Sequence, residues 1–549
     1  MPIYNAPIQD MKFILNDVFN AADFWQKNEQ LAHVDSDTVN MILEEMSKFA
    51  KNTLLPINRS GDEEGAQYLG EGKVKTPTGF KAAFDEYAQG GWIGLGGDPN
   101  HGGQGMPKMV TMLAEEMVFT ANQSFALYPN LSGGACMCIY NAGSEEQKQT
   151  YLEKIYSGEW TGTMCLTEPH AGTDLGIIKT KAVPNQDGSY SITGTKIFIT
   201  AGEHDLADNI IHLVLAKTPD APAGSKGISL FIVPKFHVNA DGSLGERNAV
   251  SCGSIEHKMG IKASATCVMN FDGAKGFMVG AENTGLASMF IMMNYERLTM
   301  GLQGIGGAEL AYQNATAYSL DRIQGRADSG IQEPNKPADP IIFHADVRRM
   351  LLNAKTISEA SRCFAMYVAK QLDTNKYTDD AEAKKAADDR VALLTPVAKA
   401  FLTDRGLEAS IDAQQCFGGH GYIREWGMEQ IVRDTRISQI YEGTNGIQSL
   451  DLLGRKVVKN GGAFVTTYVQ EMRDFANNMN ADHAIKQAIL TSADKLEDLT
   501  KAVIAAAAVN KDEINGCAVD YLQAFGYVSF AYMFGLMVEA ANGKEGDFY

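Results

Sequence analysis

Apolar residues recur at helical spacing in the first third of the chain. After the capping cluster Asp35-Ser36-Asp37, the apolar positions are Val39, Ile42, Leu43, Met46 and Phe49. The span 109–119 repeats this pattern, and Ser144-Glu145-Glu146-Gln147 has the form of a capping box. The stretch from Lys51 to Pro77 is polar and bears glycines, so we expect a surface excursion there.

The period changes from helical to strand-like at Trp160. Short β-branched and alternating runs follow at 191–193, 195–200, 210–216, 228–233 and 267–271, with turn signals such as Asp187-Gly188 and Asp241-Gly242 between them. Helical spacing returns over 286–322, 344–373, 381–416 and 496–509. The sequence predicts a mainly α protein with a central antiparallel β domain. We expect domains at 1–159, 160–280, 281–459 and 460–549, the last an added C-terminal helical region.

Composition and charge narrow the class of protein. The 549 residues carry a formal charge of −19, which repels phosphate backbones and argues against nucleic-acid binding. The eight cysteines are scattered without zinc-ligand spacing, so no metal site is predicted. The N-terminus lacks a secretory signal, and the apolar runs are shorter than the roughly 20 residues of a membrane span. We expect a cytoplasmic protein without integral membrane association.

Three segments carry candidate chemistry. They are Met164-Cys165-Leu166-Thr167-Glu168-Pro169-His170-Ala171-Gly172-Thr173-Asp174, then Gln415-Cys416-Phe417-Gly418-Gly419-His420-Gly421-Tyr422, and finally Gln439-Ile440-Tyr441-Glu442-Gly443-Thr444-Asn445-Gly446. In the last of these, Glu442 stands alone among bulky neutral residues and is followed by a glycine. Burial raises the pKa of a carboxylate, and a base of near-neutral pKa can remove a proton alpha to a thioester.

These segments, in this order, resemble the acyl-CoA dehydrogenases. The resemblance implies a helical, β, helical fold that ends in a four-helix bundle, and it assigns Glu442 as the catalytic base. It also implies that FAD accepts a hydride from Cβ of an acyl-CoA, which gives the trans-2-enoyl-CoA. The backbone N–H of Glu442 then helps to bind the thioester oxygen, where charge develops.

The resemblance also implies which residues hold FAD and substrate. Cofactor contacts fall on Met164, Leu166, Thr167, Gly172, Thr173, Phe198, Thr200, Arg322, Gln415, Gly418, Gly419, Thr444 and Asn445. Substrate contacts fall on Thr173, Tyr295, Arg297 and Gly443. Phe198 replaces a common tryptophan, Ile177 stands at a usually small position, and Gln430 stands where a basic residue is usual. Read without the resemblance, Arg297 could instead pair with Glu296 or another helical neighbour, and Arg322 could be a solvated helix-end arginine.

Partners and substrate follow from the same resemblance. Arg322 is implied to clamp the FAD of a neighbouring subunit, so we expect a homodimer, with a tetramer left open. Electron-transfer flavoprotein is the implied electron acceptor. Tyr4, Ala6, Pro7, Asp10, Phe13 and Leu15 resemble the 3-methylmercaptopropionyl-CoA dehydrogenase type, whose architecture long-form fatty acyl-CoA dehydrogenases share. Two alternatives stay open: an acyl-CoA oxidase that uses O₂, and a noncatalytic DNA-associated flavoprotein of the same fold.

Overall fold

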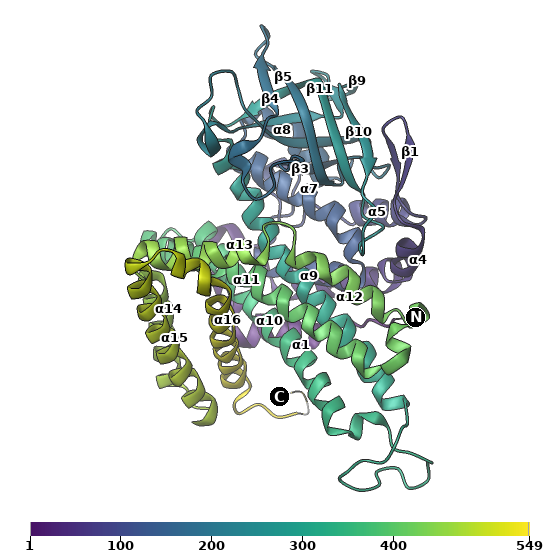
Figure 1. The fold of residues 1–549 in the computed structure, drawn as a ribbon, viewed down its shortest axis with the longest axis vertical. Helices are drawn as coiled ribbons and strands as arrows, with labels where there is room; N and C mark the ends of the chain where they lie inside the picture. The colour runs from purple at the N-terminus through teal and green to yellow at the C-terminus, as the bar shows by residue number, and fades with distance from the viewer. Residues whose placement is uncertain (1, 482, 547, 549) are drawn as a thin grey trace. The chain divides into compact units, whose positions relative to one another are not determined.

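The computed structural model describes residues 2–481, 483–546 and 548. The chain forms two compact units (Figure 1). The first unit comprises Met1–Lys51, Pro107–Ala121 and Arg297–Tyr549, and the second comprises Asn52–Met106 and Asn122–Glu296. Tyr549, at which the predicted C-terminal region ends, lies outside the described residues. The four domain boundaries expected from the sequence stay a prediction.

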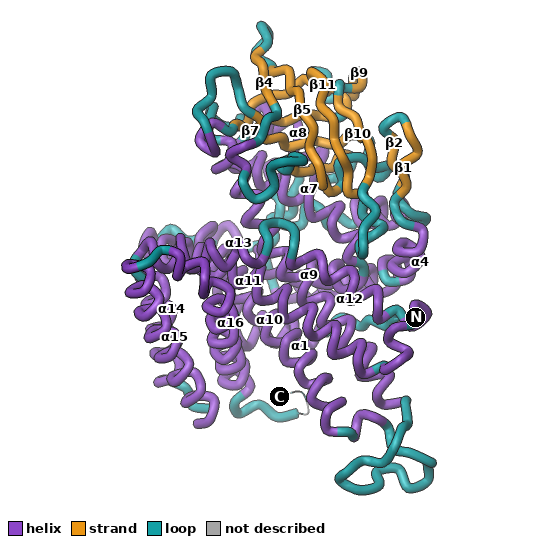
Figure 2. Tube along the Cα trace, viewed as in Figure 1, coloured by secondary structure: helices purple, strands orange, loops and turns teal. Residues whose placement is uncertain are grey.

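The second unit combines β-sheets with four complete helices and the start of α9 (Gly285–Asp321). Its helices are α4 (Pro56–Glu64), α5 (Phe80–Gln89), α7 (Gln123–Ala142) and α8 (Glu145–Tyr156). Its strands are β1 (Gln67–Gly70), β2 (Lys73–Lys75), β3 (Trp160–Cys165), β4 (Lys181–Pro184), β5 (Tyr190–Thr200), β6 (Asn209–Ala216), β7 (Ser229–Pro234), β8 (Phe236–Val238), β9 (Leu244–Arg247), β10 (Val250–Ile255) and β11 (Thr266–Val279). Figure 2 shows these strands in orange.

Seven strands form the main sheet, in the order β3-β6-β7-β11-β5-β4, with β10 also paired to β11. Most neighbours are antiparallel, as the alternating sequence pattern predicts, but β3 and β6 run parallel. The sheet is therefore mixed. A parallel pair needs a long crossover between its strands, and sequence periodicity carries no information about strand direction.

Both faces of this sheet are covered by apolar side chains. On one face, residues of α7 and α8 such as Leu131 and Leu152 pack against Ile211 of β6 and Ile232 of β7. The opposite face carries a second cluster, which includes Phe231 and Met269. Every residue of β6 is buried, because this strand contributes to both clusters. A sheet covered on both faces gives a rigid support for the loops that follow its strands.

The first unit is helical. Its helices are α1 (Ile8–Phe13), α2 (Ala21–Gln26), α3 (Ser36–Phe49), α6 (Lys108–Ala121), α9 (Gly285–Asp321, which belongs here from Arg297 onward), α10 (Ala345–Tyr377), α11 (Ala381–Cys416), α12 (Met428–Arg436), α13 (Asn445–Leu450), α14 (Ala463–Asn478), α15 (His483–Val509) and α16 (Asp512–Ala541). Close approach between them is possible where residues are small: a Cβ on Gly301 would lie 2.8 Å from the Ala398 carbonyl of α11.

The C-terminal helices are fastened to the bundle by polar contacts. Glu471 of α14 accepts hydrogen bonds from Tyr367 of α10 (2.5 Å) and Tyr532 of α16 (3.0 Å), and it pairs with Arg390 of α11 (2.8 Å). Among the described residues, α16 is the one helix long and apolar enough to cross a membrane, by length and composition only. It packs through Gly526 onto the ring of Phe401, as a core helix of a bundle does.

The sequence predicted most helices and strands within a few residues. Asp35 caps α3 by accepting from the Thr38 N–H, and the capping box of Ser144 and Gln147 opens α8. The stretch from Lys51 to Pro77 lies mostly at the surface, as predicted, but it is not irregular. It contains α4 and the β1–β2 hairpin, which are too short and too polar to show a hydrophobic period.

Candidate active site

Glu442 lies in a short loop that joins two helical turns of the first unit. The loop follows the turn Ile437–Gln439 and ends where α13 begins at Asn445. Glu442 has a φ of 55°, and Gly443 has a φ of 81°. A left-handed backbone is uncommon for a residue with a side chain, and such strained conformations recur at functional sites. Glu442 is half-buried.

Side chains on neighbouring elements hold this loop. Gln448 Nε2 donates to the carbonyl oxygens of Glu442 (3.3 Å) and Gly443 (3.4 Å). Tyr441 donates its hydroxyl hydrogen to Gln303 Oε1 at 2.6 Å. Thr444 caps α13 by accepting from the Ile447 N–H. These contacts come from both sides of Glu442, so its backbone geometry is fixed by the fold.

Two buried cations act on the Glu442 carboxylate. Burial raises the pKa of Glu442 above its ordinary value, and the positive charges of Lys399 and Arg297 oppose that rise. Arg297 is 7% exposed and lies 4.0 Å from the Asp451 carboxylate through Nη1. Glu442 therefore has the environment of a general base whose pKa has moved toward neutrality.

A second group of predicted residues lies at one end of α11. Gln415 is exposed in its last turn, and Gly418 and Gly419 open the short helix η8 (Gly418–Tyr422). A Cβ on either glycine would meet nothing within 4 Å. The backbone here is therefore open to a ligand.

Arg322 belongs to the same end of the bundle. It follows α9 and is exposed, and its N–H donates to the Tyr318 carbonyl at 2.8 Å. The Tyr318 ring stacks on Phe417 with 4.1 Å between ring centroids. The structure thus brings Arg322 together with the Gln415–Gly419 segment, as expected for one cofactor-binding surface.

The remaining predicted cofactor residues lie in the second unit, where β3 leaves the sheet beside β5. The Thr167 carbonyl accepts from the Ile197 N–H at 2.8 Å, and the Leu166 carbonyl accepts from Lys196 Nζ at 2.9 Å. Thr163 donates its hydroxyl hydrogen to the Thr200 carbonyl at 2.6 Å. These bonds hold Leu166 and Thr167 along β5.

The surface of this region suits a flat aromatic ligand. Phe198 is 59% exposed, although the next residue, Ile199, is buried, and the φ of Phe198 is 59°. Met164 and Thr200 are half-buried, whereas Gly172 and Thr173 are exposed. A Cβ on Gly172 would meet nothing within 4 Å. An exposed aromatic ring beside hydroxyls and an open backbone fits the isoalloxazine and phosphate groups of a flavin nucleotide.

Two of the predicted substrate residues are neighbours on α9. Tyr295, in the second unit, reaches α7, where a Cβ on Gly133 would lie 3.1 Å from its hydroxyl. Arg297, in the first unit, interacts with the carboxylates of Asp451 and Glu442. Glu296, in the second unit, accepts a hydrogen bond from Asn130 of α7.

Two buried lysines were missed from the sequence. Lys399 is fully buried near Glu442, and Lys196 is fully buried at 2.9 Å from Glu168. Burial pushes the pKa of Glu168 upward, but the Lys196 charge and hydrogen bonds from Thr180 and Lys179 bring it below its ordinary value. The sequence signal that could have identified Lys399 as buried is a lysine between apolar residues, as in Ala398-Lys399-Ala400.

Comparison with known proteins agrees with these local features. Family models match four consecutive parts of the chain: acyl-CoA dehydrogenase N-terminal domain (36–159), middle domain (163–274) and C-terminal domain (283–457), then acetyl-CoA dehydrogenase C-terminal like (468–549). The chain is 40% identical to 3-methylmercaptopropionyl-CoA dehydrogenase of Ruegeria pomeroyi, across 98% of this chain and 92% of that protein. The chain belongs to the acyl-CoA dehydrogenase family.

Other members of the acyl-CoA dehydrogenase family align over most of the chain. A butyryl-CoA dehydrogenase of Syntrophomonas wolfei is 37% identical over 86% of this chain and 78% of its own length. The structure of Caenorhabditis elegans ACDH-11, solved in complex with C11-CoA, covers 99% of this chain and 89% of its own, with a TM-score of 0.78 and 18% identity. That likeness extends the acyl-CoA dehydrogenase fold through the C-terminal helices. Family membership and the exposed Phe198 surface together imply a flavin cofactor.

Proposed function

We propose that Glu442 is the catalytic base of an FAD-dependent oxidation of the Cα–Cβ bond of an acyl-CoA thioester. The observation that carries this proposal is a carboxylate in a strained, firmly held loop, with a pKa raised by burial and two cations beside it. Glu442 removes the α-proton as one C–H bond breaks. Its own N–H stabilises the negative charge that develops on the thioester oxygen, and the C=C bond of the trans-2-enoyl-CoA forms.

FAD, when bound, takes the hydride that leaves Cβ and supplies the oxidising power. In this proposal Thr167, Phe198 and Thr200 hold its ring system, and Met164, Leu166, Gly172 and Thr173 line the adjoining surface. Arg322, Gln415, Gly418 and Gly419 hold the nucleotide half of a neighbouring subunit's cofactor, with Thr444 and Asn445 as further contacts. The open glycines and the exposed ring support these roles. Tyr295, Arg297, Gly443 and Thr173 contact the substrate.

The acyl group we propose is that of 3-methylmercaptopropionyl-CoA, with a fatty acyl-CoA as the alternative. The support is the 40% identity to the Ruegeria pomeroyi enzyme over nearly the whole chain. The opening segment gives no direct support, because its residues serve packing: Tyr4 is 1% exposed, and Asp10 lies 3.7 Å from the buried Arg362. Rates with a series of acyl-CoAs, including the methylmercaptopropionyl ester, decide between them.

We further propose a cytoplasmic homodimer that passes its electrons to electron-transfer flavoprotein. An acyl-CoA dehydrogenase must pass the electrons of its reduced flavin to an acceptor before the next turnover. The formal charge of −19 offers no attraction to nucleic acid. Rapid peroxide formation in air would instead indicate an acyl-CoA oxidase. Binding of duplex DNA at physiological salt would indicate the noncatalytic alternative.

The variant Glu442→Gln tests the role of the base. We expect it to fold and hold FAD, because glutamine keeps the size and one carbonyl oxygen of glutamate. It cannot accept the α-proton, so anaerobic bleaching of the flavin band by acyl-CoA should slow by about 10²–10⁴-fold or more. Binding of the acyl-CoA should persist, which a titration of the flavin spectrum measures.

Glu359→Gln is the matched control. Glu359 is half-buried on α10, burial raises its pKa, and it pairs with Lys355 at 3.4 Å. It does not face the Glu442 loop, so bleaching should proceed at the wild-type rate. Near-native bleaching by Glu442→Gln would show that another group removes the proton.

A further inference from the structure

A fully buried lysine lies beside the loop of Glu442. Lys399, on α11, is 0% exposed, and burying an ammonium group costs free energy unless the charge is compensated. Among the described residues, it donates one hydrogen bond, from Nζ to Asn445 Oδ1 at 2.8 Å. Asn445 is the first residue of α13 and follows Glu442 by three positions.

The amide of Asn445 is oriented by its other contacts. Its Nδ2 donates toward Asp404 Oδ1 (2.7 Å), Thr403 Oγ1 (2.9 Å) and the Ala400 carbonyl (3.1 Å), all on α11. These atoms accept hydrogen bonds, so the nitrogen must face them and the oxygen must face Lys399. The start of α13 is therefore tied to the same turn of α11 that carries Lys399.

The charged groups around Lys399 are few. Burial lowers the pKa of Lys399 to about 7, while the carboxylates of Glu442 and Asp404 oppose this and Arg297 adds to it. Asp404 is already engaged by hydrogen bonds from Asn445, Gln439 and Gln523. Arg297 shares its charge with Asp451. Two carboxylates therefore interact with Lys399. Among the described residues, Asp404 lies in a network of hydrogen bonds, and Glu442 does not.

We propose that Lys399 is a positioning residue for the base: anchored by Asn445, its ammonium keeps the Glu442 carboxylate ionised and holds its loop against α11. This inference rests on the proposed role of Glu442. Lys399 itself touches neither substrate nor cofactor in this assignment. A lysine suits the role because its compact charge fits a closed interior, where the wider guanidinium of an arginine needs more donors satisfied.

The proposal predicts a shift in pH dependence rather than a uniform loss of rate. Glu442 must be a carboxylate to accept the α-proton, so activity falls as the pH drops through its pKa. When the charge of Lys399 is removed, less positive charge opposes the effect of burial on Glu442, so the pKa of Glu442 rises. In Lys399→Met the acidic limb of the pH profile for flavin bleaching should move upward by about one unit or more, and raising the pH should restore most of the rate.

A second variant separates charge from folding. Lys399→Gln has no charge but can still donate to Asn445, so it should fold more readily and show the same upward shift. Lys370→Met is the matched control. Lys370 is a half-buried lysine on α10 whose pKa burial lowers, it donates to the Phe19 carbonyl at 3.5 Å, and it does not face Glu442. Its acidic limb should stay at the wild-type position.

Infrared difference titration supplies a readout that needs no turnover. The C=O band of protonated Glu442, identified by its loss in Glu442→Gln, should titrate at a higher pH in Lys399→Met and Lys399→Gln than in the wild type. Unchanged midpoints in both variants would overturn the role of Lys399. If Glu442→Gln kept full activity while these midpoints still shifted, the coupling would stand and the assignment of Glu442 as base would fail.

Discussion

Backbone strain and side-chain chemistry coincide at two of the proposed site residues. Glu442 and Phe198 both have positive φ angles, of 55° and 59°. Each such conformation costs about 1–3 kcal/mol in a residue with a side chain, so the surrounding contacts must over-determine it. At Glu442 the Gln448 amide supplies that restraint. The same contacts that impose the strain therefore aim the carboxylate.

Asp373 provides a residue-scale test of stability against pH. It is buried, and it accepts from the backbone N–H groups of Lys108 (2.7 Å) and Met109 (3.0 Å) at the start of α6. Burial raises its pKa from 3.8 to about 6. As the pH rises from about 4 to 6, the unfolded state loses this proton before the folded state does, so the folded state loses about 3 kcal/mol of stability.

The wild type should therefore lose stability relative to Asp373→Asn as the pH rises. We expect the melting temperature of the wild type minus that of Asp373→Asn to decrease between pH 4 and pH 7. Asp35→Asn gives a control of opposite sign. A hydrogen bond from the Thr38 N–H lowers the pKa of the exposed Asp35. The melting temperature of the wild type minus that of Asp35→Asn should therefore grow as the pH rises and the Asp35 carboxyl loses its proton. A pH-independent difference for Asp373→Asn, measured by calorimetry, would contradict the assigned shift.

At the scale of elements, sequence periodicity predicted what depends on local pattern. Helix α11 begins at Ala381 and ends at Cys416, as its apolar spacing and the following glycines indicate. The parallel pairing of β3 with β6 could not be predicted, because it joins segments separated by more than 40 residues. For the same reason the sequence assigned Glu442 by motif but missed Lys399, whose role arises only when α11 packs beside the loop.

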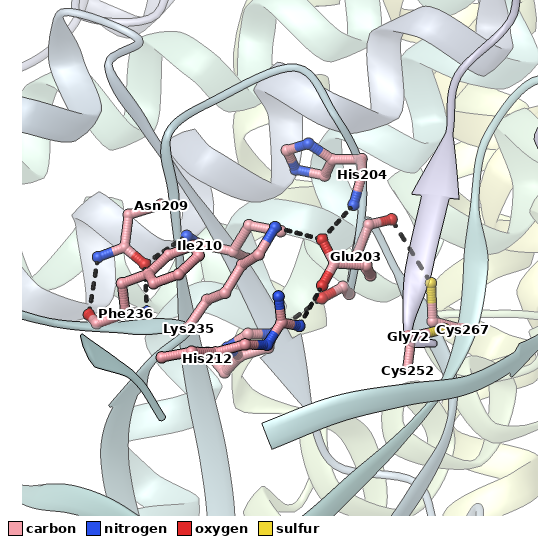
Figure 3. Close-up of polar contacts among 12 residues, drawn as sticks. Gly72, Glu203, His204, Asn209, Ile210, His212, Lys235, Phe236, Cys252 and Cys267 are labelled. Atoms are coloured by element: carbon pink, nitrogen blue, oxygen red, sulfur yellow. Dashed lines mark hydrogen bonds and ion pairs between the residues drawn. The ribbon is translucent and has the colours of Figure 1, made fainter. Parts of the chain in front are cut away.

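Buried ion pairs join the loops of the second unit. Figure 3 shows Glu203, which follows β5, facing Lys235 between β7 and β8. Its other oxygen accepts from Arg247 of β9 at 3.0 Å. Glu203 is 3% exposed and Lys235 is 9% exposed, so these charges compensate each other away from water.

Lys235→Met should leave Glu203 buried with a single cation, and we expect a loss of about 2–4 kcal/mol of stability. The double variant Glu203→Gln/Lys235→Met should recover much of it, because the one charge left unpaired, that of Arg247, is 39% exposed and can be hydrated. Lys275→Met is the control: Lys275 pairs with Asp187 at 2.8 Å, both are well exposed, and its loss should cost less than about 1 kcal/mol. Equal losses in Lys235→Met and Lys275→Met, measured by denaturant unfolding, would show that burial adds nothing to the Glu203 pair.

For the whole molecule, the proposed dimer depends on which subunit Arg322 serves. Arg322, Gln415, Gly418 and Gly419 form an exposed surface at one end of the helical unit. In a two-fold dimer each subunit presents the same surface to the other. Loss of the Arg322 guanidinium should therefore weaken retention of FAD in the partner subunit, while the dimer persists in light scattering.

Hybrid dimers distinguish action across the interface from action within one subunit. One subunit carries Arg322→Ala and the other carries Glu442→Gln, each with its own affinity tag, and neither parent homodimer turns over well. If Arg322 serves the partner's FAD, the subunit that carries Arg322→Ala keeps its own base and receives an intact arginine from its partner, so one of the two sites is complete. Activity of about half the wild-type level per dimer is then expected. If Arg322 acts within its own subunit, both sites of the hybrid are defective and the hybrid stays inactive. Hybrids of wild type with Glu442→Gln, which have one complete site under either arrangement, calibrate the measurement.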